Sequence, residues 1–268
     1  MNTLLFHDVY VLNYATSVTN DEANGPLGSQ FDVYYQDLYC TKESYEKAEQ
    51  ELMRSSIHQA LAKAGIKISD IGFVVGGDLM NQLMTTNYVF RDLNTPSVGV
   101  YGACSNSALS IAIASLLSTY TQQMTIATTA SHYASAEKQF RYPNEYGIQK
   151  RNTTTTTVSG AGAVILTNKK QNIHVKAATI GKIIDGEQRD VNDMGTPMSL
   201  AAYDTITTHF KNTKTNFEDY DLVVTGDLSG IGHAILKDML RSTGHDTEVL
   251  QDCGLIISRN MKNMFQGG

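Results

Sequence analysis

The chain of 268 residues is poor in cysteine, in clustered positive charge and in long apolar runs. Three cysteines are too few, and odd in number, for a disulfide framework, so we expect a reducing compartment. The lysines and arginines are scattered, the densest cluster is the pair Lys169–Lys170, and the formal net charge is −6. Nucleic-acid binding needs a concentrated basic surface, so nucleic acids are excluded as expected partners.

Two further absences concern membranes. Residues 1–13 contain no cationic region, and polar residues interrupt their apolar run early, so we expect no signal peptide. The most apolar window, 111–117, is far too short to cross a bilayer, so we expect no transmembrane segment. The sequence therefore predicts a soluble protein, which can still associate peripherally with a membrane complex.

What the chain has is a regular alternation of strand and helix patterns. The expected helices are 43–64, 81–93, 105–119, 200–210 and 231–241. The expected strands are 71–75, 98–101, 124–129, 158–166, 173–184, 221–225 and 253–258, with 158–166 and 173–184 paired to each other. This alternation predicts an α/β fold with a largely parallel sheet.

An internal repeat sharpens this prediction. Segments 70–79 and 219–228 both hold a buried strand that ends in Gly-Asp-Leu, and they match in register 149 residues apart. Each follows a helix and a short polar linker, and each leads into another helix. We therefore predict two duplicated α/β halves. Cys253 lies at the same offset from Cys104, but 253–258 resembles a strand, so we interpret Cys253 as a buried strand residue.

Cys104 is the residue with the clearest chemical potential, because it stands where strand 98–101 gives way to helix 105–119. Unpaired N–H groups and the helix dipole at such a position favour a thiolate or bind an anion. A small, buried and inert cysteine is equally common. The residues alone leave three roles open, which are nucleophile, part of a binding pocket, and packing.

The duplicated halves, the cysteine at the turn and the glycine-rich segment 158–166 together resemble the thiolase superfamily. Within it, the chain resembles the stage V sporulation protein AD family most closely. The segments that carry this resemblance are 25–29 with 31–32, 102–105, 136–147, 193–195, 226–230 and 252–255. They span nearly the whole chain in order, and 140–147 is the most specific, because generic condensing enzymes lack it.

The resemblance implies a thiolase-like fold of two duplicated α/β halves, with mixed, mainly parallel sheets in layers. The expected halves are 1–170, which carries Cys104, and 171–268, which we expect to be incomplete because the family continues further. The implied function is to bind dipicolinic acid (pyridine-2,6-dicarboxylate), with or without Ca²⁺, and to take part in its uptake into the developing spore. The implied partners are other proteins of a channel in the spore inner membrane and a second copy of the chain, joined through 98–101; no cofactor is implied.

The resemblance also suggests a set of ligand-binding residues. A planar dianion needs N–H or guanidinium donors and flat walls. The expected donors and walls are Cys104, Ser105, His132, Arg141 and Tyr142. Asp78 is a further candidate beside them, although a carboxylate repels the ligand unless Ca²⁺ bridges the two, so capping of a turn is the favoured role for Asp78 and Asp227. His132 is equally well explained as a loop histidine satisfied by backbone. No metal-ligand spacing is visible.

Enzymatic activity is the competing interpretation. A thiolase-like acyltransferase or condensing enzyme would use Cys104 as nucleophile, with a histidine after the strand at 222–225. This chain has Gly226 and Asp227 there, and His233 falls further on, inside a predicted helix. We therefore expect a protein that is not an enzyme. The alternatives are an acyltransferase that uses Cys104 and a structural subunit with a vestigial pocket.

Overall fold

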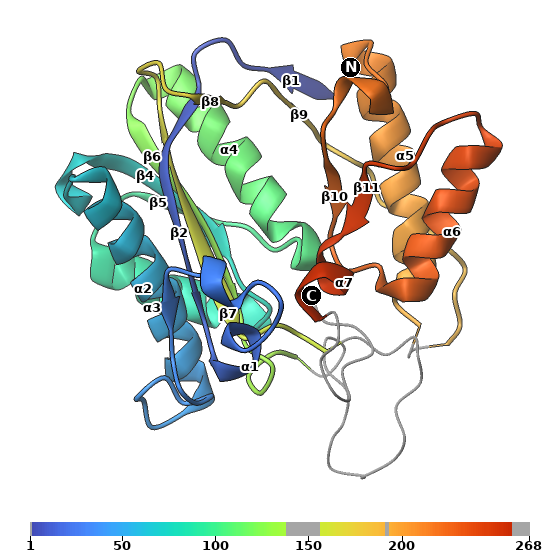
Figure 1. The fold of residues 1–268 in the computed structure, drawn as a ribbon. Helices are drawn as coiled ribbons and strands as arrows, with labels where there is room; N and C mark the ends of the chain where they lie inside the picture. Colours follow the sequence, from blue (N-terminus) through green and yellow to red (C-terminus); the bar gives the residue numbers. More distant parts are fainter. Residues whose placement is uncertain (1, 138–155, 191–192, 259–268) are drawn as a thin grey trace, which may run out of the picture. The chain divides into compact units, whose positions relative to one another are not determined.

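The computed structural model describes residues 2–137, 156–190 and 193–258 (Figure 1). The chain divides into two compact units. The first unit comprises Leu5–Glu137 and Thr157–Ala177, and the second comprises the rest of the chain. The predicted halves, 1–170 and 171–268, follow sequence order alone, whereas the N-terminal residues group here with the second unit.

The first unit is built on a mixed sheet with the strand order β3-β2-β7-β6-β4-β5, in which β8 also pairs with β2. β4 is parallel to both β5 and β6, and β7 is antiparallel to both β2 and β6. The strands are β2 (Tyr10–Val18), β3 (Val33–Tyr34), β4 (Ile71–Gly77), β5 (Ser97–Gly99), β6 (Met124–Ser131), β7 (Gly160–Thr167) and β8 (Ile173–His174).

Helices cover both faces of this sheet. The helices are α1 (Asn20–Ala23), α2 (Tyr45–Ala64), α3 (Met84–Leu93) and α4 (Asn106–Thr121). α2 and α3 lie on one face and α4 lies on the other (Figure 1). The side chain of Ser44 caps the start of α2, and Gly65 ends it at φ 67°. Leu52 and Ile57 of α2 are fully buried and form part of the core against the sheet.

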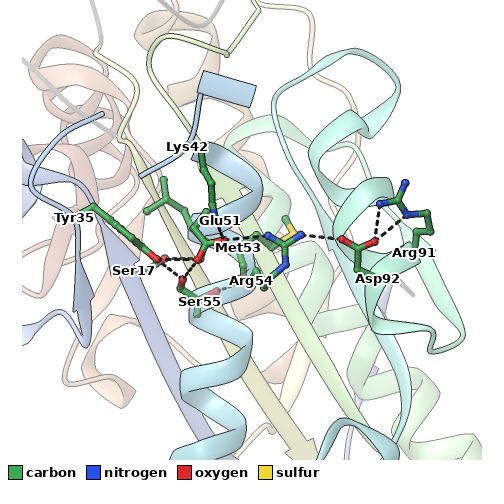
Figure 2. Close-up of polar contacts among 11 residues, drawn as sticks. Ser17, Tyr35, Lys42, Glu51, Met53, Arg54, Ser55, Arg91 and Asp92 are labelled. Atoms are coloured by element: carbon green, nitrogen blue, oxygen red, sulfur yellow. Dashed lines mark hydrogen bonds and ion pairs between the residues drawn. The ribbon is translucent and has the colours of Figure 1, made fainter. Parts of the chain in front are cut away.

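A surface network joins α2 to its neighbours (Figure 2). The carboxylate of Glu51 accepts hydrogen bonds from Lys42, from Arg54 and from the Tyr35 hydroxyl, and Arg54 also pairs with Asp92 of α3 at 2.9 Å. Partial burial raises the pKa of Glu51, but the hydrogen bond and charge of Lys42 and the charge of Arg54 outweigh it and lower the pKa. The network thus fixes α2 against α3 and against the loop before it.

The second unit contains two two-stranded sheets, β1 with β9 and β10 with β11. Its elements are β1 (Thr3–Leu5), β9 (Ala177–Thr179), α5 (Gly195–Thr213), β10 (Val223–Thr225), α6 (Ser229–Ser242), β11 (Leu250–Asp252) and α7 (Cys253–Ser258). Phe210, Phe217, Leu236, Leu240 and Leu250 form its buried core.

The internal repeat is visible in both units. α2, β4, α3 and β5 follow one another in the first unit as α5, β10, α6 and β11 do in the second. The pairing also begins at equivalent residues of the first strands, since Val74 of β4, opposite Ser97, is equivalent in the repeat to Val223 of β10, opposite Leu250. Both strand pairs are parallel. The predicted α/β architecture is therefore confirmed.

Two predictions about strands were wrong. Residues 253–258 form the helix α7, and the strand is β11 just before it. The carboxylate of Asp252 accepts the N–H of Leu255 and so favours a helical turn that the apolar pattern conceals. Segments 158–166 and 173–184 do not pair with each other, because β7 pairs with β2 and β6, β8 pairs with β2, and β9 pairs with β1. Two of these partners, β1 and β2, lie near the N-terminus, where no strand had been predicted.

None of the helices in the described parts of the chain is long and apolar enough to cross a membrane.

Candidate functional site

Cys104 lies at the turn between β5 and α4, in the short 3-10 helix Ala103–Ser105. Cys104 and Ser105 are both exposed, so the thiol is not the buried packing residue that one interpretation allowed. Ala103 adopts φ 46°, a left-handed conformation that is strained for a residue with a Cβ. Ser105 stands at the N-cap of α4 and donates its hydroxyl to the carbonyl of Gly102 at 2.7 Å. The turn thus presents Cys104 at the positive end of a 16-residue helix.

The buried side chain of Asn106 holds this turn in place through two hydrogen bonds. Its side chain is 2% exposed, and its Oδ1 accepts the N–H of Gly102 at 2.5 Å. Its Nδ2 donates to the backbone carbonyl of Asp78 at 3.3 Å. This buried amide therefore connects the Cys104 turn to the end of β4, a role that sequence reasoning did not predict. Amides at the start of a predicted helix are the signal that could have found it.

Asp78 is fully buried directly after β4. Its Oδ1 accepts the N–H of Met80 at 2.8 Å, and its Oδ2 accepts the N–H and the hydroxyl of Thr86 at 2.7 and 2.6 Å. Burial raises its pKa, and the hydrogen bonds from Thr86 and Met80 oppose that rise. This carboxylate caps the turn into α3, so the geometry agrees with a structural role rather than with direct contact to an anion.

His132 is fully buried after β6. The N–H of Ala134 donates to Nδ1 at 3.1 Å, so Nδ1 is an acceptor and Nε2 carries the proton, which it donates to the carbonyl of Leu38 at 2.8 Å. Burial lowers the pKa of His132 and favours this neutral form. Both ring nitrogens are thus engaged by backbone. A role in ligand binding stays a prediction, as do those of Arg141 and Tyr142, which lie outside the described residues.

Glu49 is a buried acid that sequence reasoning missed. It lies on α2, is fully buried, and accepts the Ser135 hydroxyl on Oε2 at 2.5 Å. Burial raises its pKa to about 8, and the negative charge of Asp78 adds to the effect. A glutamate on the apolar side of a helix, between Ala48 and Leu52, is the sequence signal that could have identified it.

An apolar cleft of about 150 Å³ opens beside the start of α4 in the first unit. Ser107 and Ile111 of α4 line one side, and Tyr14, Thr128 and Val164 of the sheet line the other. The cleft offers flat apolar surface close in sequence to Cys104. Within the described residues, no three histidine, cysteine or acidic side chains lie together as a metal site.

The second unit places Asp227 after β10, as Asp78 follows β4. Asp227 is 4% exposed; its Oδ1 accepts the N–H of Ser229 at 2.9 Å, and its Oδ2 has no hydrogen-bond partner among the described residues. Burial raises its pKa to about 6, and the nearby charge of Asp252 contributes. His233 is half-buried inside α6, and burial lowers its pKa. Cys253 is half-buried and lies at the start of a helix directly after a strand. Cys104 lies in a similar place, in the short turn between a strand and a helix.

Comparison with known proteins gives consistent matches. The family model described as Stage V sporulation protein AD (SpoVAD) matches residues 2–268. A Bacillus subtilis (strain 168) protein named Stage V sporulation protein AD is 43% identical over 264 residues, which cover 98% of this chain and 78% of that protein.

Solved structures show the same fold at low sequence identity. Cerulenin-bound OleA from Xanthomonas campestris matches with a TM-score of 0.64 at 14% identity, over 93% of this chain and 85% of that one. The 3-oxoacyl-[acyl-carrier-protein] synthase III from Aquifex aeolicus VF5 matches with a TM-score of 0.58 at 11% identity, over 91% and 83%. At such identities the likeness shows the fold alone, and that fold is thiolase-like.

Proposed function

Because the chain belongs to the stage V sporulation protein AD family, we propose that it binds dipicolinic acid and takes part in its uptake into the developing spore. In this role it is not an enzyme. It acts beside other proteins of a channel in the spore inner membrane, to which it attaches peripherally. Ca²⁺ accompanies the ligand as its counter-ion where it is present.

The observation that carries this proposal is the geometry of the Cys104 turn. Cys104 and Ser105 are exposed at the positive end of α4, where N–H groups and the helix dipole attract a carboxylate. Buried Asn106 holds the turn in place, so the position is preorganised. Arg141 would supply a guanidinium for the second carboxylate and Tyr142 a flat face for the ring, which are the groups a planar dianion requires.

The absence of enzymatic activity is inferred from the second unit. A cysteine nucleophile in an acyl transfer needs an adjacent base. The positions after β10 are Gly226 and Asp227, and the nearest histidine in sequence, His233, lies inside α6. An aspartate can accept a proton, but it cannot form with a thiol the imidazolium–thiolate pair that activates such cysteines.

The alternative function is an acyltransferase that uses Cys104. It is favoured by the exposure of that thiol at a strained strand-to-helix turn and by the fold, which is shared with a 3-oxoacyl synthase. The two functions are separated by mass spectrometry after incubation with acyl-CoA. An acyl adduct on Cys104 that forms and turns over supports the enzyme, and an unmodified Cys104 supports the binding protein.

A homodimer is part of the proposal. β5 is an edge strand of the first unit's sheet, and its three residues are exposed. Val98 and Tyr101 expose 38% and 50% of their surface, and Met84 and Tyr88 of α3 expose 43% and 46%. An exposed edge strand with apolar side chains around it favours pairing with a second copy. Light scattering tests this, because Val98→Asp should convert a dimer into a monomer.

The experiment for the main proposal is a calorimetric titration with dipicolinate, with and without Ca²⁺. The wild-type protein should show saturable binding, and Cys104→Ala should weaken it. The matched control is Thr121→Ala, which changes an exposed residue at the opposite end of α4. If a folded sample gives no binding heat under either condition, the proposed function is wrong.

A further inference from the structure

Residues 132–137, here called the anchor segment, follow β6 and are held by three different parts of the first unit. The Ser135 hydroxyl donates to Oε2 of Glu49 on α2 at 2.5 Å. His132 donates to the carbonyl of Leu38 at 2.8 Å. Glu137 accepts the N–H of Asn81, just after β4, at 2.9 Å. Of these three contacts, the one between Ser135 and Glu49 involves a fully buried acid.

The charges that face Glu49 are unfavourable for its ionised form. The charges of Asp78, at the end of β4, and of Glu46, on the same helix, both raise the pKa of Glu49, whereas the side chain of Thr85 on α3 lowers it and only partly offsets the burial. The anchor segment contributes the neutral His132 and the acidic Glu137. Within the described residues, no ion pair reaches Glu49, and its Oε1 has no hydrogen-bond partner. An unpaired charge in this position is strongly disfavoured.

We propose that Glu49 is a proton-dependent latch for the anchor segment: the segment covers the neutral carboxyl and holds Ser135 against α2, and loss of the proton favours opening, because the cost of a buried charge exceeds the gain from a stronger hydrogen bond with Ser135. The raised pKa, about 8, is consistent with a neutral carboxyl in the held state at neutral pH. Loss of the proton leaves a negative charge on Glu49, which water stabilises better than the protein interior does. Opening of the anchor segment lets water reach this charge.

The latch adjoins the Cys104 turn through Asp78. The side chain of Asp78 faces Glu49, and its backbone carbonyl accepts the side chain of Asn106, which supports the turn. Ionisation of Glu49 therefore places a second negative charge near Asp78, whose backbone carbonyl helps to hold Asn106 and the Cys104 turn. This consequence for ligand binding rests on the proposed function, whereas the latch itself does not.

The direction and size of the pH effect follow from linkage. In the open segment Glu49 is hydrated, and its pKa falls toward 4.5, the ordinary value for a glutamate. Since the held state has the higher pKa, holding is strongest below about pH 4.5 and is lost as the pH rises toward 8. One proton is released per opening in that window, so the opening constant rises about tenfold per pH unit and levels off above pH 8.

The test is hydrogen exchange of peptides that cover the anchor segment, measured by mass spectrometry between pH 5.5 and 9 and corrected for intrinsic exchange. The wild-type protein should show the tenfold rise per pH unit up to about pH 8. Glu49→Gln, which is neutral at every pH, should show a flat profile. The matched control is Glu43→Gln, an exposed glutamate just before α2, which should behave as the wild type does.

Two results would overturn the proposal. One is a flat pH profile in the wild-type protein, and the other is a slope in Glu49→Gln equal to that of the wild type. Should Glu49→Gln fail to fold, Ser135→Ala decides, because loss of this hydrogen bond must raise opening even at pH 5.5. A parallel series with saturating dipicolinate separates the two proposals. Suppressed opening supports both, whereas an unchanged pH slope without any ligand effect leaves the latch intact and counts against the proposed binding site.

Discussion

Replacing Asp227 by asparagine should stabilise the protein, although Asp227 is buried and follows a strand as Asp78 does. Its equivalent in the repeat, Asp78, has both carboxylate oxygens hydrogen-bonded, by Met80 and Thr86. Asp227 has a donor on Oδ1 only, from Ser229. Its Oδ2 has none among the described residues, because the position that corresponds to Thr86 is Ile235. Asp227 is therefore a buried charge with incomplete compensation.

The magnitude follows from the pKa of Asp227, which burial raises from 3.8 to about 6. Each pKa unit corresponds to about 1.4 kcal/mol, so ionised Asp227 destabilises the fold by about 3 kcal/mol above pH 6. Because the folded pKa is the higher one, the stability is fully present below pH 3.8 and is lost as the pH rises through 6. Asp227→Asn should recover most of this at pH 8 and less than about 1 kcal/mol at pH 4.

Urea unfolding at pH 4 and pH 8, with hydrogen exchange of α6 as the local readout of the second unit, measures this effect. Asp78→Asn is the matched comparison. It should destabilise by about 1–3 kcal/mol, because its amide group would face the donors of Thr86. The reasoning is refuted if Asp227→Asn destabilises the second unit at pH 8, or if its effect is the same at both pH values.

Three further predictions concern packing and the site. Asn106→Ala should lower the free energy of unfolding by about 1–3 kcal/mol in urea, because it leaves the Gly102 N–H without its acceptor; no loss would argue against the support of the turn. Leu52→Ala should cost about 2–5 kcal/mol in the same assay, since Leu52 is fully buried, and a change below 1 kcal/mol would contradict this. Gly232→Ala should destabilise α6, because the new Cβ would lie 2.5 Å from the carbonyl oxygen of Gly195, whereas Gly162→Ala has nothing within 4 Å and should be tolerated in a thermal melt.

Much of the fold follows from local sequence pattern. The apolar spacing along 43–64 and the glycine that ends it predicted α2 to within two residues, and the run 71–75 predicted β4. These elements are specified by their own residues, through helical periodicity and burial. The repeat was visible because both copies of the strand end in Gly-Asp-Leu.

The wrong strand pairing and the failure to identify Glu49 have a common cause, which is that strand pairing and burial depend on distant residues. The antiparallel partners of β7 include β2, about 150 residues earlier in the chain, so no local pattern reveals the pairing. The same holds for Glu49, whose hydrogen bond to Ser135 spans 86 residues. Cys253 was misassigned because the apolar residues that follow it fit a strand and a short helix equally well.

The place of Cys104 in the fold was predicted from the sequence, whereas the contacts around it were not. Cys104 was expected at a strand-to-helix turn, and it lies there. The support by Asn106 and the backbone partners of His132 depend on side-chain geometry, which a sequence does not specify. Asp78 fits the turn-capping role favoured for it, because short-range hydrogen bonds of aspartate after a strand are a local property.

The most direct test of the central claim is the rate at which iodoacetamide alkylates Cys104, with and without saturating dipicolinate, measured by mass spectrometry. Cys104 is exposed, Cys253 is half-buried and Cys40 is fully buried, so each thiol reports separately and the last two serve as internal references. A ligand at the turn should slow the alkylation of Cys104 and leave that of Cys253 unchanged. An unchanged rate at Cys104, with dipicolinate bound by calorimetry, would contradict the placement of the ligand at this turn.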